Sequence, residues 1–372
     1  MGKEVKMDIG RRLKNARDAI GYTLEKAEKE SGIGASSLSE FENGKREPKF
    51  SQINVLAEVY KRSIDFFLTD KLPVEPVMLW RDGPGSQEEK KETEAEFRRL
   101  CQQYHKLELC TAEMRKAMLP QPDVTNADQF SWPQAELFAR KVQKELCLGD
   151  IPSASLKKIL EERYYVKIFH LEFSGSAIST VSEEFGPAVL LNSRNVAWRR
   201  NYDLAHELFH LLTWGIFRAK SKEPSENEDK LADSFASKLL MPDESLKQRI
   251  ASMANEQGEA RLEQLDDLAR EFGVSPDATV YRVANLYRIR KEDTEKFLAA
   301  AKQLAKLHKS RESDKVKTLP ERYCDLAQRA LRDGRLSLMQ FAKYMGISYK
   351  EAQEYLTDDE GFTDEEISIP VA

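Results

Sequence analysis

The sequence is poor in the residues that build disulfide frameworks and cysteine-rich metal sites. Among its 372 residues there are four cysteines (Cys101, Cys110, Cys147 and Cys324) and five histidines, and no two cysteines form a C-x-x-C pair. So few cysteines exclude a disulfide-stapled fold and favour reduced thiols in a cytosolic protein. With only five histidines in the chain, a pair of them at the spacing of a functional motif would rarely arise by chance.

The sequence also lacks long apolar runs and an excess of charge of one sign. No window approaches the 18 uninterrupted apolar residues of a membrane span, and the first residues contain no apolar stretch like that of a signal peptide. We therefore expect a cytoplasmic protein with no membrane contact. The 58 Lys+Arg against 63 Asp+Glu give a formal net charge of -5, which excludes a strongly basic protein that coats nucleic acid.

The hydrophobic fraction of 41% is enough for buried cores, and the length predicts two or three domains. We expect a mainly helical, α+β chain. Residues 1–70 predict a five-helix domain, and residues 71–128 predict a Pro- and Gly-containing linker followed by a long, solvated, charged helix. A partner helix packed against it, or self-association through it that gives a homodimer, is an alternative. Residues 293–372 predict a charged helix, a small helical module and an acidic tail over 358–366.

Residues 129–292 predict a second folded unit in which the apolar period changes. Helical spacing over 134–147 gives way to β-branched and aromatic stretches at 164–173, 177–181 and 188–191, separated by Gly175 and Gly186. These stretches predict a small antiparallel sheet of three strands. Helices dominate again from Tyr202.

One motif in this unit carries chemistry. His206, Glu207 and His210 form an H-E-x-x-H pattern within an apolar helix. Residues four apart share a helix face, so both imidazoles can bind one zinc ion. Zinc lowers the pKa of a bound water, and Glu207 can take its proton so that the water attacks a peptide carbonyl. Ordinary core histidines, and a zinc site without catalysis, are the alternatives.

A third zinc ligand is expected from an acidic residue in segment 226–242, ENEDKLADSFASKLLMP. Glu228 and Asp229 flank the buried stripe of this helix about equally at 100° per residue, so periodicity does not choose between them. Asp233 lies nearer the edge of the stripe, and we expect it to orient a histidine from behind.

These motifs together resemble a known family. GPAVLLN and WRRNYDLAHELFHLL followed by LADSFASKLLMP and LAREFGVSPDATVYRVANL are similar to the ImmA/IrrE zinc metallopeptidases. The resemblance covers about residues 130–292 and implies a zincin-like domain. It implies that Asp229, which stands where the family has glutamate, is the acidic ligand, with Glu228 as the fallback. It also implies cleavage of a protein, often a helix-turn-helix repressor, under stress or prophage control.

The N-terminal segment GRRLKNARDAIGYTLEKAEKESGIGASSLSEFENGKREP resembles the Xre/Cro class of helix-turn-helix domains, with E-x-G-K-R-x-P ending at Pro48. The resemblance implies that the helix over 35–43 enters the major groove and that Lys45 and Arg46 lie near phosphates. The candidate DNA contacts are Ser36, Ser37, Ser39, Glu40, Asn43, Lys45 and Arg46.

The charge of this segment keeps a second role open. Residues 1–70 hold 13 Lys+Arg and 12 Asp+Glu, so their net charge is only +1, and the 35–43 helix has two carboxylates and no base. Carboxylates repel phosphate. Dimerisation, or docking of a protein partner, is therefore the alternative to DNA binding.

Our leading hypothesis is a cytoplasmic zinc metallo-endopeptidase fused to an Xre-like domain. His206, His210 and Asp229 hold Zn²⁺, and Glu207 is the general base. The substrate is a regulatory protein such as a helix-turn-helix repressor or an antitoxin. The alternative is a DNA-binding transcription regulator or toxin–antitoxin component whose peptidase-like domain senses a ligand or partner without proteolysis. A third hypothesis is a scaffold with purely structural zinc, which requires a fourth protein ligand.

Overall fold

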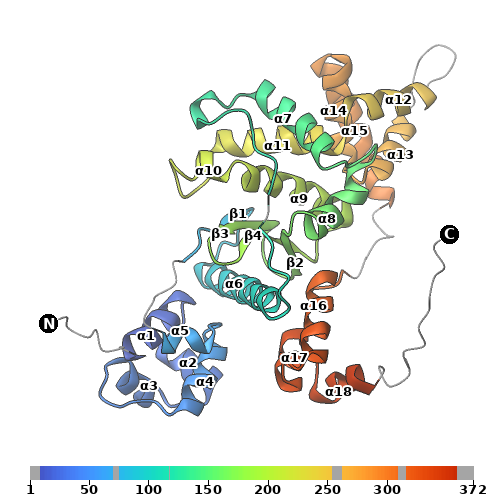
Figure 1. Ribbon diagram of the computed structural model, residues 1–372. Helices are drawn as coiled ribbons and strands as arrows, with labels where there is room; N and C mark the ends of the chain where they lie inside the picture. The colour runs from blue at the N-terminus through green and yellow to red at the C-terminus, as the bar shows by residue number, and fades with distance from the viewer. Residues whose placement is uncertain (1–8, 70–74, 117, 254–261, 309–315, 358–372) are drawn as a thin grey trace, which may run out of the picture.

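The computed structural model describes residues 9–69, 75–116, 118–253, 262–308 and 316–357. It confirms a mainly helical α+β chain with one small sheet (Figure 1). The strands are β1 (Leu79–Arg81), β2 (Lys167–Leu171), β3 (Ala177–Ser182) and β4 (Gly186–Asn192). The first ten helices are α1 (Ile9–Ala19), α2 (Leu24–Ser31), α3 (Ala35–Glu42), α4 (Phe50–Val59), α5 (Ile64–Leu68), α6 (Gln87–Cys110), α7 (Trp132–Glu145), α8 (Pro152–Glu162), α9 (Ala197–Leu212) and α10 (Trp214–Phe217). The others are α11 (Glu226–Leu240), α12 (Asp243–Met253), α13 (Leu262–Phe272), α14 (Pro276–Tyr287), α15 (Lys291–His308), α16 (Glu321–Arg332), α17 (Leu338–Met345) and α18 (Tyr349–Thr357), with a 3-10 turn at Ala127–Gln129.

The N-terminal domain contains the five predicted helices, α1 to α5. Thr23 caps α2 by accepting a hydrogen bond from the Lys26 amide at 3.2 Å, and Gly32 ends that helix with a φ of 69°. Its core is built from apolar residues on or next to all five helices, and Ala95 of α6 packs into it. The residues of the five-helix part are Leu13, Ala16, Ile20, Ala27, Leu38, Phe41, Ile53, Leu56, Ala57, Tyr60, Phe66 and Phe67.

The sheet differs from the predicted three-stranded antiparallel arrangement. It has four strands in the order β1-β3-β4-β2, and β2 pairs with β4 in parallel. Two causes explain the error. The alternation of apolar residues tells which face a side chain occupies, but not which strand is its neighbour. In addition, β1 comes from residues 79–81, which we predicted to be linker, because three residues are too few to give a periodic signal.

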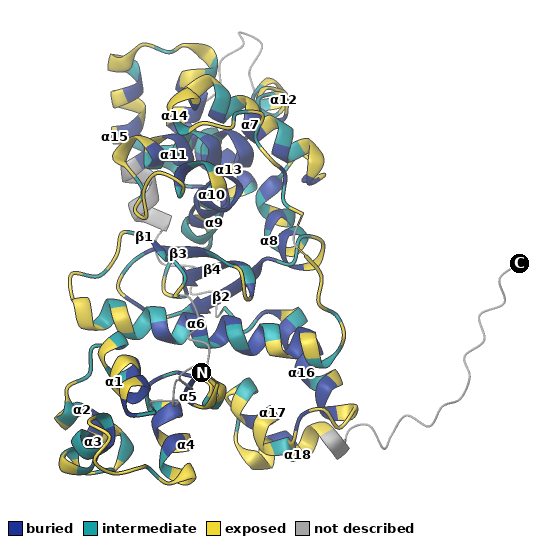
Figure 2. Ribbon diagram, turned by 60° about the vertical axis from the view of Figure 1, so that its left-hand side comes forward, coloured by how far each residue is buried: buried dark blue, intermediate teal, exposed yellow. Residues whose placement is uncertain are grey.

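Both faces of the sheet are buried. Along β4, Val189 and Leu191 belong to the core beneath α7, α9 and α11, whereas Ala188 and Leu190 belong to a second core on the opposite face. This alternation follows from the two-residue period of a strand. The sheet therefore separates a large helical layer, which carries the H-E-x-x-H motif, from a smaller one (Figure 2).

The helix predicted to be long and solvated, α6, is instead a major part of the second core. Its apolar side chains Phe97, Leu100, Cys101, Tyr104 and Leu107 are buried against the sheet and against α16 to α18. The prediction was wrong because α6 has a narrow apolar stripe within a highly charged sequence, and such a stripe alone does not reveal whether a partner covers it.

The remaining predictions concern the end of the chain and membranes. The helix predicted from residue 293 is α15, and the small C-terminal helical module is α16 to α18. The acidic tail predicted over 358–366 lies outside the described residues. In the part of the chain that the structure describes, no helix combines the length and apolarity of a membrane span.

Candidate metal centre

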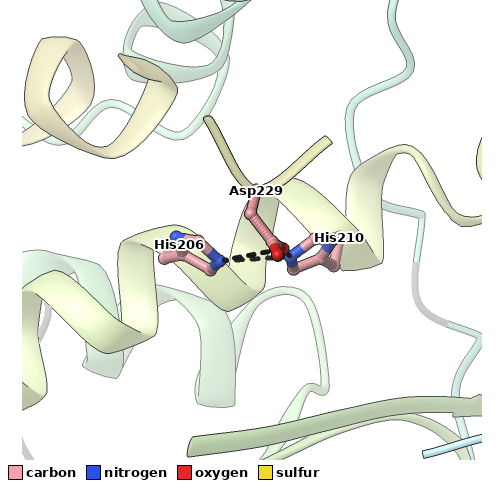
Figure 3. Close-up of side chains that lie close together, drawn as sticks. All are labelled: His206, His210 and Asp229. Atoms are coloured by element: carbon pink, nitrogen blue, oxygen red, sulfur yellow. Dashed lines mark hydrogen bonds and ion pairs between the residues drawn. The ribbon is translucent and has the colours of Figure 1, made fainter. Parts of the chain in front are cut away.

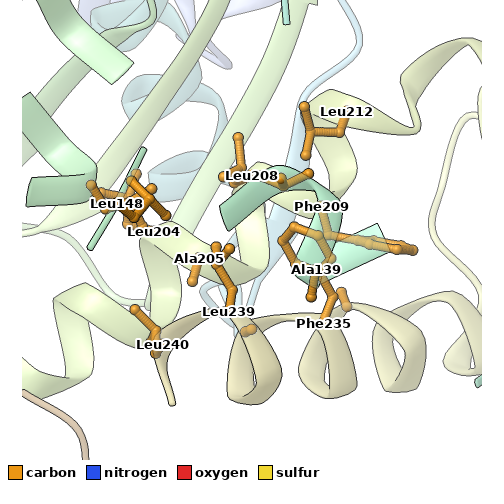
Figure 4. Packing of buried hydrophobic residues seen from close by; sticks show 14 of the residues in the cluster. Ala139, Leu148, Leu204, Ala205, Leu208, Phe209, Leu212, Phe235, Leu239 and Leu240 are labelled. Atoms are coloured by element: carbon orange, nitrogen blue, oxygen red, sulfur yellow. The ribbon is translucent and has the colours of Figure 1, made fainter. Parts of the chain in front are cut away.

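The H-E-x-x-H residues lie on a helix that is held by a large core. On α9, His206, Glu207 and His210 are 4%, 1% and 3% exposed. Apolar side chains of α9 pack against α7 and α11 and so fix the helix between these elements (Figure 4). Those of α9 are Leu204, Ala205, Leu208 and Phe209, and they meet Ala139 of α7 and Phe235 and Leu239 of α11. Helical spacing places the two imidazoles on one face, so that they project together toward α11.

The two imidazoles converge with the carboxylate of Asp229, which α11 supplies (Figure 3). The Nε2 atoms of His206 and His210 are 3.2 Å apart. Asp229 Oδ1 lies 3.9 Å from His206 Nε2 and 3.5 Å from His210 Nε2. Among the described residues, these three are the group of His, Cys, Asp and Glu side chains whose ligand atoms lie close enough to hold one metal ion.

Glu228, the fallback ligand, lies elsewhere. Its Oε1 is 2.9 Å from His210 Nδ1, and the guanidinium of Arg218 binds both of its carboxylate oxygens. Glu228 is thus behind the His210 ring, on the side away from Nε2. Successive residues on a helix point 100° apart, so only one of the two neighbours on α11 can face the gap between the imidazoles.

Asp233 has the corresponding place behind His206. Its Oδ1 lies 2.9 Å from His206 Nδ1. An ionised carboxylate can only accept a hydrogen bond, so each histidine donates from Nδ1, and the neutral ring keeps its Nε2 lone pair for a metal. Tyr202 supports this arrangement by donating to the Asp233 carbonyl at 3.1 Å.

The two histidines differ in proton affinity. Burial lowers the pKa of His206 to about 4, although Asp233 opposes the change. Burial also disfavours charge on His210, but Asp229 and Glu228 outweigh it and raise the pKa of His210 to about 9. Without a metal, the His210 imidazole is therefore protonated near neutral pH, because its positive charge is stabilised by Asp229 and Glu228. A metal ion would have to displace that proton, because only the neutral imidazole is a ligand.

Glu207 is buried with weak hydrogen bonding. Among the described residues, neither of its carboxylate oxygens makes a well-formed hydrogen bond. Burial raises the pKa of the carboxyl group, although the positive charge of His210 and the nearby Ser179 hydroxyl oppose the change. A buried carboxyl group without a well-formed hydrogen bond is costly, typically by about 1–3 kcal/mol or more. Its carboxyl group is close enough to His210 for the two charges to interact, which puts it near the candidate metal centre.

The donor set fits zinc. Donor atoms about 2.0–2.1 Å from a tetrahedral zinc ion are separated by roughly 3.3 Å, close to the 3.2 and 3.5 Å seen for His210 with its two neighbours. Among the described residues the cluster contains three ligands and not four. Three protein ligands are typical of catalytic zinc, which keeps one position open, whereas structural zinc is closed by four.

The residues predicted to contact DNA lie on or just after α3. Ser36 and Lys45 are exposed, Ser37 and Ser39 are half-buried, and Asn43 donates to the Ser39 carbonyl at 2.8 Å. Asn43 and Arg46 are exposed as well, so this part of the surface is open to solvent.

The carboxylates of this surface are paired with arginines. Glu40 lies 3.2 Å from Arg46, which also stacks over the Phe41 ring. Glu42 accepts two hydrogen bonds from Arg17, at 2.6 and 2.9 Å. Pairing of this kind neutralises both acidic groups and so weakens the electrostatic objection to phosphate binding.

Sequence reasoning missed two arginines that support the centre. Arg218 binds Glu228, and Arg81 lies 3.2 Å from Asp233 although 152 positions separate them along the chain. Arg218 follows α9 closely in the sequence, so it could have been considered as a partner for Glu228. No local pattern identifies Arg81.

Comparison with known proteins finds two matching family models along the chain. A helix-turn-helix family model matches residues 13–67, and the peptidase M78 model, described as the IrrE N-terminal-like domain, matches residues 161–284. The chain is 37% identical over 62 residues to the HTH-type transcriptional regulator ImmR of Bacillus subtilis, a match that covers 17% of this chain and 49% of ImmR. The match therefore spans about half the length of that relative.

Two solved structures also align along the chain. PlcR of Bacillus thuringiensis, in complex with the peptide PapR7 and DNA, aligns over 95% of this chain and 96% of its own, with 13% identity and a TM-score of 0.17. ComR of Streptococcus suis aligns over 95% and 94%, with 14% identity and a TM-score of 0.16. Scores this low carry no argument. The family models and ImmR establish that an Xre-type helix-turn-helix domain precedes an IrrE/ImmA-like domain.

Proposed function

We propose that this protein is a zinc-dependent metallo-endopeptidase that cleaves a regulatory protein, and that its N-terminal domain binds DNA. The observation that carries the first part is the convergence of His206, His210 and Asp229 beside the buried carboxylate of Glu207. The peptidase M78 match supports the same reading. The regulatory role rests on the helix-turn-helix domain and on the likeness to ImmR.

Each residue of the centre has one role in the proposed reaction. His206, His210 and Asp229 would hold Zn²⁺, and Asp233 and Glu228 orient the two imidazoles from behind. When bound, zinc acts as a Lewis acid and makes a water molecule acidic enough to lose a proton near neutral pH. Glu207 is the general base. Because burial raises its pKa, it is a stronger base than a solvated glutamate and can later return the proton to the leaving amine.

The experiment compares the wild-type chain with Glu207→Gln, which keeps the shape of the side chain but cannot take a proton. We expect both proteins to bind about one zinc per chain by elemental analysis, since Glu207 is not a ligand. New protein N-termini, labelled and identified in cells producing each version, should appear only with the wild type. Removal of a general base costs about 10²- to 10⁴-fold in rate. Equal cleavage by both proteins would refute the role of Glu207.

The experiment with the wild type and Glu207→Gln also identifies candidate substrates. A regulatory protein such as a helix-turn-helix repressor or an antitoxin should be among the proteins cut in a Glu207-dependent manner. With these two proposed activities the protein would work in the cytoplasm, where DNA and such substrates are found.

The second candidate function is a transcription regulator whose peptidase-like domain senses a ligand or partner without cutting it. It is favoured by the pairing of Glu40 and Glu42 with arginines and by the likeness to ImmR. Selection from random-sequence DNA duplexes, followed by titration at several salt concentrations, tests DNA binding. If His206→Ala still binds the selected duplex as the wild type does, and no Glu207-dependent cleavage is found, this second function replaces the first.

A further inference from the structure

Arg81 belongs to a strand that neither family model covers. It ends β1, where it pairs with Ala177 at the edge of the sheet, and β1 is the first described element after the five helices of the N-terminal domain. The matched ranges are residues 13–67 and 161–284. The side chain nevertheless reaches the metal centre and is only 14% exposed.

The guanidinium of Arg81 connects the two helices that supply the metal ligands. Its Nε lies 3.2 Å from Oδ1 of Asp203, a fully buried residue on α9 that precedes His206 by three positions. Its Nη2 lies 3.2 Å from Oδ1 of Asp233, which follows Asp229 by one helical turn on α11. One planar group thus fixes the distance between the helix that carries both histidines and the helix that carries the acidic ligand.

The same contact determines how Asp233 meets His206. Asp233 Oδ1 binds both Arg81 Nη2 at 3.2 Å and His206 Nδ1 at 2.9 Å. Arg81 therefore holds this carboxylate in one orientation, which in turn fixes the plane of the His206 ring. Lysine cannot do this equally well, because a single ammonium lacks the rigid fork that meets two carboxylates at once.

We propose that Arg81 is a positioning residue of the metal centre, through which the strand that follows the helix-turn-helix domain becomes part of the metal site. The assignment rests on the proposed function in one respect only, namely that a metal ion binds His206, His210 and Asp229. It adds that the affinity for this ion depends on a residue outside the peptidase-like segment.

A purely structural ion pair is the competing explanation, and the chain offers a matched control for it. Arg199 binds the same oxygen of Asp203, with Nε at 3.1 Å, and also binds Asp82 and Ser176. It belongs to α9 itself and has no contact with Asp233 among the described residues. Loss of either arginine weakens the pairing of Asp203, but only loss of Arg81 releases Asp233.

The experiment measures the affinity of the full chain for Zn²⁺ and Co²⁺ by competition with a chelator, for the wild type, Arg81→Gln, Arg81→Lys and Arg199→Gln. The Co²⁺ absorption spectrum reports the ligand geometry, and the melting temperature of each metal-free protein reports the fold. Removing groups that orient a metal-bound histidine typically weakens binding about 10- to 100-fold. We expect roughly tenfold weaker binding and an altered Co²⁺ spectrum for Arg81→Gln, and a smaller loss for Arg81→Lys.

Arg199→Gln should bind both ions within about twofold of the wild type, since the groups that orient the metal-bound histidines stay in place. Wild-type affinity in Arg81→Gln, or equal losses in Arg81→Gln and Arg199→Gln, would overturn the assignment of Arg81 alone. If Arg81→Gln does not fold, the comparison of Arg81→Lys with Arg199→Gln decides in the same way. A wild-type chain that binds neither ion would overturn both this assignment and the proposed function.

Discussion

Glu228 and Asp229 are neighbours on α11, yet only Asp229 faces the Nε2 atoms of the two histidines. Asp229 Oδ1 is 3.5 Å from His210 Nε2, whereas Glu228 Oε1 is 2.9 Å from His210 Nδ1 on the other side of the ring. We therefore predict different outcomes for the two substitutions. Asp229→Ala should abolish stoichiometric zinc binding, because it removes a ligand and a negative charge. Glu228→Gln should still bind one zinc per chain, about 10- to 100-fold more weakly.

Elemental analysis after dialysis, with chelator competition for the affinities, measures both effects. Asp229→Glu is the matched control, since it restores a carboxylate at the position of the ligand and should recover binding. If Glu228→Gln loses the metal while Asp229→Ala keeps it, the two residues have exchanged roles and the zinc ligand is Glu228.

A second prediction concerns Gly10, where α1 meets α3. An added Cβ atom would lie 2.3 Å from the Phe41 carbonyl oxygen, which is backbone and cannot move aside cheaply. Glycine in a helix interior is normally less stable than alanine by about 0.5–1 kcal/mol. Here the clash outweighs that gain, so we expect Gly10→Ala to unfold or loosen the N-terminal domain. Hydrogen exchange of α1 to α5 measures this change.

The zinc content of Gly10→Ala should match that of the wild type, because the metal centre lies on α9 and α11. Gly44→Ala is a useful comparison, as nothing lies within 4 Å of its added Cβ. Its φ of 68° costs only local strain. Greater protection of α1 in Gly10→Ala than in the wild type would contradict the predicted close approach.

The sequence was enough to predict His206, Glu207 and His210 as candidate site residues, because the H-E-x-x-H pattern depends on helical spacing alone. The choice between Glu228 and Asp229 depends on how α11 is rotated against α9, which periodicity does not determine when both residues flank the buried stripe. Arg81 could not be found, because its contact with Asp233 depends on the pairing of β1 with β3, and strand order is set by tertiary contacts. The burial of α6 was missed for the same reason, since its partners α16 to α18 lie far along the chain.

A third prediction concerns Glu108, which joins three distant segments. This side chain on α6 is 3% exposed and lies 2.9 Å from Lys167 Nζ of β2 and 2.6 Å from Arg322 Nη1 of α16. Although burial opposes ionisation, His105, Lys167 and Arg322 keep the pKa of Glu108 below its usual value. Glu108→Gln leaves Lys167, itself 4% exposed, without its countercharge.

Removing one partner of a buried ion pair typically costs about 3–5 kcal/mol. We therefore expect Glu108→Gln to increase hydrogen exchange in α6 and α16 by several orders of magnitude, with little change in α1 to α5. A second variant that also carries Lys167→Met should recover much of the protection, because the unpaired ammonium is gone. If the single variant exchanges as slowly as the wild type, Glu108 does not hold the C-terminal helices to α6.

The fourth prediction is a pH dependence of stability caused by Glu161 on α8. Its side chain is 10% exposed, and Oε1 has no hydrogen-bond partner among the described residues; Lys157 Nζ is 4.0 Å away. Burial, with Glu321 and Glu162 nearby, raises the pKa of Glu161 from 4.5 to about 7. The folded protein therefore binds more protons than the unfolded chain between these values, so its stability falls as pH rises through this window.

The size of the effect follows from about 1.4 kcal/mol per pKa unit, which gives a loss of roughly 3–4 kcal/mol above pH 7. Glu161→Gln removes the ionisable group and should raise the melting temperature relative to the wild type at pH 8, but not at pH 4.5. Glu162→Gln is the matched control, since its side chain is 55% exposed, and its effect should vary little over this range. A Glu161→Gln variant whose gain over the wild type is the same at pH 4.5 and pH 8 would show that Glu161 ionises equally in the folded and unfolded states.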